Sequence, residues 1–129
     1  MTTLALQVGA GSDDAREIGD GTVELSDASQ ISLSAATYWA GMRWTGVTVA
    51  QAATISSASL EIYTINSTSD VAGGAVVYGQ AADNAATFAA STNNITGRSR
   101  TTASATWSGD LSGPGWKSLD VTSIVQEIV

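Results

Sequence analysis

Apolar and polar residues alternate along residues 38–45, which is the pattern of a strand with one face in the core. Met42 and Trp44 fall on one face of this strand, and Trp39 and Arg43 fall on the other. We therefore expect Met42 and Trp44 to face the core, with Trp39 and Arg43 pointing outward.

The same alternation returns after a turn, where Leu60 and Ile62 alternate with Glu61 and Tyr63. We expect Leu60 and Ile62 to point inward and the other two side chains to meet water. Together the two arms predict a strand, a turn and a strand over residues 41–63. The apolar face of such a unit needs a covering layer.

Shorter alternating runs occupy much of the remaining chain. They are residues 3–8, 23–25, 31–33, 75–81, 103–107 and 116–121. Between two of them, Asp20-Gly21 is typical of a type I′ hairpin turn. The long connection at residues 83–100 contains the one Phe of the chain, Phe88, which we expect to fix the connection to the sheets.

The last residues predict a short helix that Asp120 or Thr122 caps. Its apolar side is formed by Ile124, Val125, Ile128 and Val129. Seven to nine short strands with turn signals, followed by one short C-terminal helix, predict an all-β fold. We expect an antiparallel β-sandwich or jelly roll. A chain of 129 residues has room for one such domain, residues 1–129.

The charge of the chain argues against nucleic acid as a partner. There are 12 acidic and 5 basic residues, which gives a formal charge of −7, so backbone phosphates would be repelled. No apolar run approaches the roughly 20 residues of a membrane span, and the first residues lack the pattern of a secretory leader. We expect no membrane contact and folding in a cytoplasm.

The chain contains neither His nor Cys, and this limits the chemistry available to it. A hydrolase needs a positioned base, acid or nucleophile, and the candidates here reduce to carboxylates, Tyr, Ser and Lys117. The acidic residues gather in the N-terminal quarter or lie singly at turns, so no pair of carboxylates is predicted to share a cleft. We expect a protein that is not an enzyme.

Four acidic residues close together are candidate oxygen ligands for Ca²⁺. They are Asp13, Asp14, Glu17 and Asp20. Their spacing does not match the 12-residue calcium loop, and the alternative is a solvated acidic surface. We therefore expect no metal and keep Ca²⁺ as the alternative.

The aromatic residues leave two kinds of contact open. Trp39 and Tyr63, with Arg43 and Glu61 beside them, can stack on and hydrogen-bond to a sugar. The same side chains also suit a subunit contact, where Trp, Tyr and Arg are enriched. Trp44 and Trp107 follow the apolar alternation and are assigned to the core, whereas the pattern does not decide for Trp116.

Several runs resemble the jelly-roll sandwich domain of phage virion proteins and environmental surface proteins. They are residues 41–47, 53–60, 78–80, 83–84, 94–95, 98, 105–107 and 120–129. That domain is similar to the DNRLRE-type modules and to carbohydrate-binding modules. Ala50 and Ala52 stand where the family has Pro and Gly in a turn, and the run that gives the DNRLRE modules their name is absent.

The resemblance implies a non-enzymatic virion protein, either a capsid decoration (cement) protein or a tail or fibre component. The family continues beyond the C-terminal helix into further strands. Either the sheet closes with fewer strands and Val129 ends a compact domain, or one edge stays open. Our hypothesis is the open edge, with the missing strand, or a cover for Ile128 and Val129, supplied by a neighbouring subunit. The partners implied are other virion proteins and copies of this chain. The alternative is a carbohydrate-binding module that recognises a polysaccharide through exposed aromatics.

Overall fold

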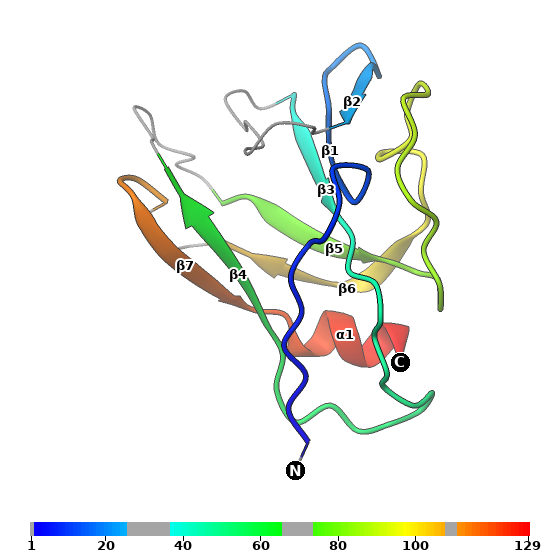
Figure 1. The fold of residues 1–129 in the computed structure, drawn as a ribbon, viewed down its shortest axis with the longest axis vertical. Coiled ribbons are helices and arrows are strands. Elements are labelled where there is room, and N and C mark those ends of the chain that lie inside the picture. Colours follow the sequence, from blue (N-terminus) through cyan, green and yellow to red (C-terminus); the bar gives the residue numbers. More distant parts are fainter. Residues whose placement is uncertain (1, 26–36, 66–73, 108–110) are drawn as a thin grey trace. The chain divides into compact units, whose positions relative to one another are not determined.

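The computed structural model describes residues 2–25, 37–65, 74–107 and 111–129. These residues form seven strands and one helix, and the strands pair in three small antiparallel sheets (Figure 1). The prediction of an all-β chain with one short C-terminal helix is confirmed. By its contacts the chain divides into two compact units. Unit 1 is Met1–Val49 with Asn84–Arg98, and unit 2 is Ala50–Asp83 with Ser99–Val129.

The sheet of unit 1 has three strands in the order β2-β1-β3. They are β1 (Asp14–Glu17), β2 (Val23–Leu25) and β3 (Trp39–Met42). The turn between β1 and β2 lies at Asp20-Gly21 as predicted, and the Gly21 N–H donates to the carbonyl of Ile18 over 2.8 Å. The predicted turn type, I′, is wrong, however, because it requires a positive φ at both central residues, and of Asp20 and Gly21 only Gly21 has one, +85°. The turn is a three-residue loop that ends in one left-handed residue.

The buried face of β3 is the one that carries Gly41, which pairs with Ala15 of β1. Ala15 has no exposed surface, and Phe88 from the 84–98 segment packs on this face with 7% of its surface exposed. The predicted role of Phe88 is confirmed. The prediction that Met42 and Trp44 occupy the core is wrong, since both are half-buried. The alternation predicted the wrong inward face of β3, because the residue on the true inward face, Gly41, has no side chain.

Unit 2 contains two two-stranded sheets and the helix. The first sheet pairs β4 (Ser59–Thr64) with β7 (Gly115–Asp120), and the second pairs β5 (Val76–Gln80) with β6 (Arg100–Thr106). Its buried apolar residues are Leu60, Trp107, Leu111, Val121 and Ile124. The core assignments of Leu60 and Trp107 are confirmed, whereas Ile62 is half-buried.

The predicted strand–turn–strand unit at residues 41–63 is wrong. Both arms are strands, but β3 pairs with β1 in unit 1, whereas β4 pairs with β7 in unit 2. Alternation indicates which side chains can be buried, but it does not specify the partner strand. Nearness in sequence suggested a pairing that the structure does not have.

The other strand predictions have mixed outcomes. Strands occur within residues 23–25, 75–81, 103–107 and 116–121, whereas residues 3–8 form no strand. Leu4 and Leu6 of that last run are 44% and 40% exposed. The prediction at residues 31–33 lies outside the described residues.

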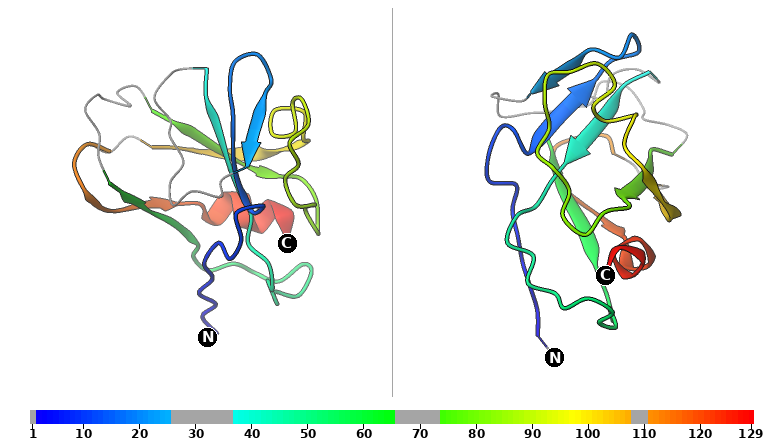
Figure 2. Two further views of the ribbon diagram at one scale, coloured as in Figure 1. Left: turned by 45° about the horizontal axis from the view of Figure 1, so that its top comes forward. Right: turned by 90° about the vertical axis from the view of Figure 1, so that its right-hand side faces the viewer.

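The helix α1 (Thr122–Ile128) packs against β5 and β6 (Figure 2). Gly79 of β5 permits this contact, because a Cβ there would lie 2.6 Å from Ile128 Cδ1 and 2.8 Å from Ile124 Cγ2. The predicted cap is wrong. Val121 occupies the N-cap, and Asp120 instead accepts a hydrogen bond from the Thr122 N–H over 2.9 Å.

The helix is also tied to β6 by the Glu127 carboxylate. It accepts the backbone N–H groups of Thr102 and Ala103, each over 2.7 Å, and these bonds hold the pKa of Glu127 below its usual 4.5. Because the pKa of Glu127 is lower in the folded than in the unfolded state, its carboxylate stabilises the fold at pH values above the unfolded-state pKa. This stability is lost as the pH falls through the folded-state pKa. We expect Glu127→Gln to lose the part of the acid sensitivity below pH 4.5 that comes from this group. Unfolding of both proteins as a function of pH measures it, and identical profiles would contradict the assignment.

A turn at residues 50–53 places Ala52 in an unusual backbone conformation. The Ala53 N–H donates to the Ala50 carbonyl over 3.1 Å, and Ala52 has φ of +60°, as the third residue of a type II turn requires. Glycine adopts this conformation without the steric cost that Cβ brings. We expect Ala52→Gly to stabilise unit 2 by about 0.5–1 kcal/mol in urea unfolding. A loss of stability would show that Ala52 is not strained.

Candidate functional site

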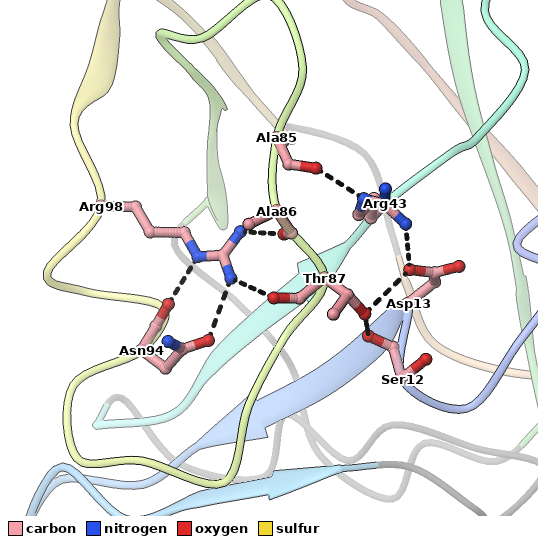
Figure 3. A network of polar contacts seen from close by, with 8 residues as sticks. All are labelled: Ser12, Asp13, Arg43, Ala85, Ala86, Thr87, Asn94 and Arg98. Carbon is pink, nitrogen blue, oxygen red and sulfur yellow. Dashed lines mark hydrogen bonds and ion pairs between the residues drawn. The ribbon is translucent and has the colours of Figure 1, made fainter.

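Buried charges hold the 84–98 segment of unit 1 against its sheet (Figure 3). The Arg43 guanidinium contacts the Asp13 carboxylate at 2.6 Å and donates to the Ala85 carbonyl at 2.7 Å. Thr87 donates its hydroxyl to the Ser12 carbonyl over 2.8 Å. The side chain of Asp13 is only 10% exposed and that of Arg43 is 21% exposed, so this ion pair is poorly screened by solvent. The pair fixes the start of the segment.

Arg98 binds the same segment from its other end (Figure 3). Its guanidinium donates to the carbonyls of Ala86, Thr87 and Asn94 at 2.6–2.9 Å and lies 4.3 Å from the centre of the Phe88 ring. Burial, and then the charge of Arg43, lower the pKa of Arg98. These three acceptors are backbone groups, so Arg98 shapes the main chain of the segment, and it also donates to Asn94 Oδ1 over 2.9 Å.

Glu17 makes the third attachment and is the most buried charged residue described. It is 1% exposed, and its Oε2 accepts the backbone N–H groups of Ile95 and Thr96 at 2.8 and 3.0 Å. The Thr96 hydroxyl donates to its other oxygen. A carboxylate buried at this depth is tolerated because its oxygens are hydrogen-bonded.

The prediction of a solvated acidic surface is therefore wrong for two of the four acidic residues. Glu17 is buried on the face of β1 that also carries Ala15, and Asp13, the residue just before β1, is buried as well. The sequence held a signal for this arrangement, because positions 13, 15 and 17 fall on one side of a strand. That signal was missed because alternation is normally read from apolar side chains.

The four calcium candidates occupy separate environments. Asp14 lies on the opposite face of β1 from Ala15 and Glu17, and its Oδ1 is buried without a hydrogen-bond partner. Burial raises the pKa of Asp14. Asp20 lies in the turn, where its carboxylate accepts the Thr22 N–H. Within the described residues no three acidic side chains come together as a metal site would require.

The predicted ligand-binding residues divide between the two units. Trp39 is 36% exposed on β3, and Arg43 of the same unit is engaged in the contacts described above. Glu61 and Tyr63 are exposed on β4 of unit 2. Ile128 and Val129 are half-buried. Ile128 packs against β5, and the Val129 carbonyl accepts the Ala52 N–H over 2.6 Å.

The residue that the sequence left undecided, Trp116, is the most exposed large hydrophobic side chain described, at 69%. It lies opposite Tyr63 across the β4–β7 pair, and the ring centres are 5.4 Å apart with an angle of 75° between the rings. Tyr63 is itself 54% exposed. We call these two residues the aromatic pair. Alternation alone could not identify it, because the register of β4 against β7 brings the rings together.

Comparison with protein-family models, curated proteins and solved structures gave no match. The resemblance to phage virion domains and DNRLRE-type modules therefore stays a prediction. No helix in the described parts of the chain combines the length and apolar character needed to cross a bilayer.

Proposed function

We propose that this protein is a non-enzymatic structural component of a phage virion, either a capsid decoration (cement) protein or part of a tail or fibre. In this proposal the sheets form one antiparallel β-sandwich of jelly-roll type, made in the host cytoplasm and assembled onto the particle through contacts between subunits. The partners are capsid or tail subunits and further copies of this chain.

The observation that carries the proposal is the small size of the two sheets described in unit 2. Within the described residues each of its four strands has one strand neighbour, so each keeps one edge without a ladder. Exposed apolar residues lie on the same strands, among them Val76 at 49% and Tyr78 at 44%. Such edges are either protected or used to pair with another chain, and strand addition is a common form of protein recognition.

The use of the charged residues also supports a structural role. Asp13, Glu17, Arg43 and Arg98 all make contacts that fix the 84–98 segment. These contacts are made to other groups of the chain, most of them backbone groups of the segment. The structural use of these four residues supports the proposal of a non-enzymatic role.

Sedimentation and electron microscopy test the proposal. We expect the protein to self-associate or to bind particles purified from the same source, and Val76→Lys to reduce this association because lysine on an edge strand opposes pairing. The matched control is Val47→Lys, since Val47 is 54% exposed and lies outside the strands. A stable monomer that binds no particle would overturn the proposal.

A further inference from the structure

The outer face of the β4–β7 sheet has a regular arrangement of side chains. Three cross-strand pairs point to this face, and all six residues are exposed. They are Ser59 with Asp120, Glu61 with Ser118, and Tyr63 with Trp116. Aromatic groups thus lie at one end and hydrogen-bonding groups follow along the strands, at steps of about 7 Å.

The two rings of the aromatic pair contact each other without a ligand. Their edge-to-face contact favours one arrangement of the rings, which lowers the side-chain freedom to be lost on binding. Glu61 and Ser118 are the next pair along the same face. An apolar surface beside a carboxylate and a hydroxyl matches the surface of a sugar ring, which has an apolar C–H face and a rim of hydroxyl groups.

The charge of this face also limits which charge a ligand can carry. The two charged residues among the six are the carboxylates Glu61 and Asp120. Lys117 pairs with Ile62, so it points to the other face, and its Nζ donates to the Ser112 carbonyl over 3.0 Å. On a chain of net charge −7 an anionic ligand would be repelled here.

The size of the apolar part argues against a protein as the occupant. Two aromatic rings cover far less than the roughly 800 Å² that each partner contributes to a standard protein interface. A saccharide, by contrast, needs only one or two rings to stack on.

We propose that the aromatic pair binds a neutral, hexopyranose-containing glycan, which stacks on the more exposed ring, Trp116, touches Tyr63 beside it, and donates hydroxyl hydrogens to Glu61. This function goes beyond the proposed assembly role and does not depend on it. The site differs from the one expected from the sequence, because Trp116 takes the place of Trp39 beside Tyr63.

Affinity gel electrophoresis of the full chain with hydroxyethyl cellulose, laminarin, xylan and galactomannan tests the proposal, and polygalacturonate serves as the anionic control. We expect retention by at least one neutral polysaccharide. Trp116→Ala and Tyr63→Ala should each weaken it by about tenfold or more, and Glu61→Gln should weaken it less. The matched control is Trp39→Ala, an exposed tryptophan on β3 of unit 1, which should bind as the unmodified protein does. Circular dichroism checks that each variant is folded.

Three results would each overturn the glycan site. They are no retention by any neutral polysaccharide, retention by polygalacturonate alone, and equal losses for Trp39→Ala and Trp116→Ala. If Trp116→Ala abolished self-association while no glycan bound, the face would be a contact between copies of the chain, which also refutes the site. The outcome for Val76→Lys is separate, because that variant tests strand-edge assembly.

Discussion

Replacing Glu17 with Ala is expected to lower the free energy of unfolding by about 3 kcal/mol. The substitution removes the acceptor of the Ile95 and Thr96 N–H groups and of the Thr96 hydroxyl. These donors belong to half-buried residues. A buried donor left without a partner costs about 1–3 kcal/mol, and water that enters the space offsets part of this cost. Urea unfolding measures the loss. Hydrogen exchange should show faster exchange at the two amides.

The matched control is a surface glutamate on the same sheet. Glu24 pairs with Arg16, and its side chain is 52% exposed, so Glu24→Ala should cost no more than about 1 kcal/mol. Glu17→Gln keeps one oxygen that can accept the amides and is expected to fall between the two. If Glu17→Ala and Glu24→Ala unfold at the same urea concentration, Glu17 does not hold the 84–98 segment.

Replacing Gly41 with Ala is expected to destabilise unit 1 by about 1–3 kcal/mol, although alanine is normally tolerated in a strand. A Cβ at this position would lie 2.5 Å from Cζ of Phe88 and 2.7 Å from its Cε1. Phe88 is buried against Ala15 and Val23, so the ring has little space into which it can move. Thermal and urea unfolding measure the effect.

A second substitution separates this clash from other effects of the new side chain. Phe88→Leu replaces the ring that meets the added Cβ with a smaller side chain. The double variant Gly41→Ala/Phe88→Leu should therefore lose less stability than the sum of the losses in the two single variants. Gly9→Ala is the control, because nothing lies within 4 Å of a Cβ at Gly9. Additive losses in the double variant would exclude the predicted contact.

Local chemistry was sufficient to predict several elements of this fold. Asp20-Gly21 predicted the position of a hairpin turn, and the final residues predicted a helix. Phe88 predicted where a long connection packs against a sheet. Each of these depends on residues close together in the sequence or on a single large apolar side chain. Such features follow from turn chemistry, helical spacing and hydrophobicity.

Features that depend on distant residues were not predicted. The sequence does not specify that β4 pairs with β7, so the contact between Tyr63 and Trp116 could not be found from alternation. The burial of Glu17 depends on donors at positions 95 and 96, far along the chain. The inward face of β3 could not be predicted from the sequence, because its buried residue, Gly41, has no side chain and therefore gives no hydrophobic signal.

The attachment of the 84–98 segment has a consequence for how its surface can vary. Arg43 and Arg98 donate to main-chain carbonyls at Ala85, Ala86 and Thr87, and these acceptors are present whatever side chain the residue carries. The side chains of residues 89–92 are exposed. New amino acids can therefore be introduced at those four positions while the path of the backbone is kept. That property makes this segment a suitable place to graft a short peptide epitope or a fluorescent label.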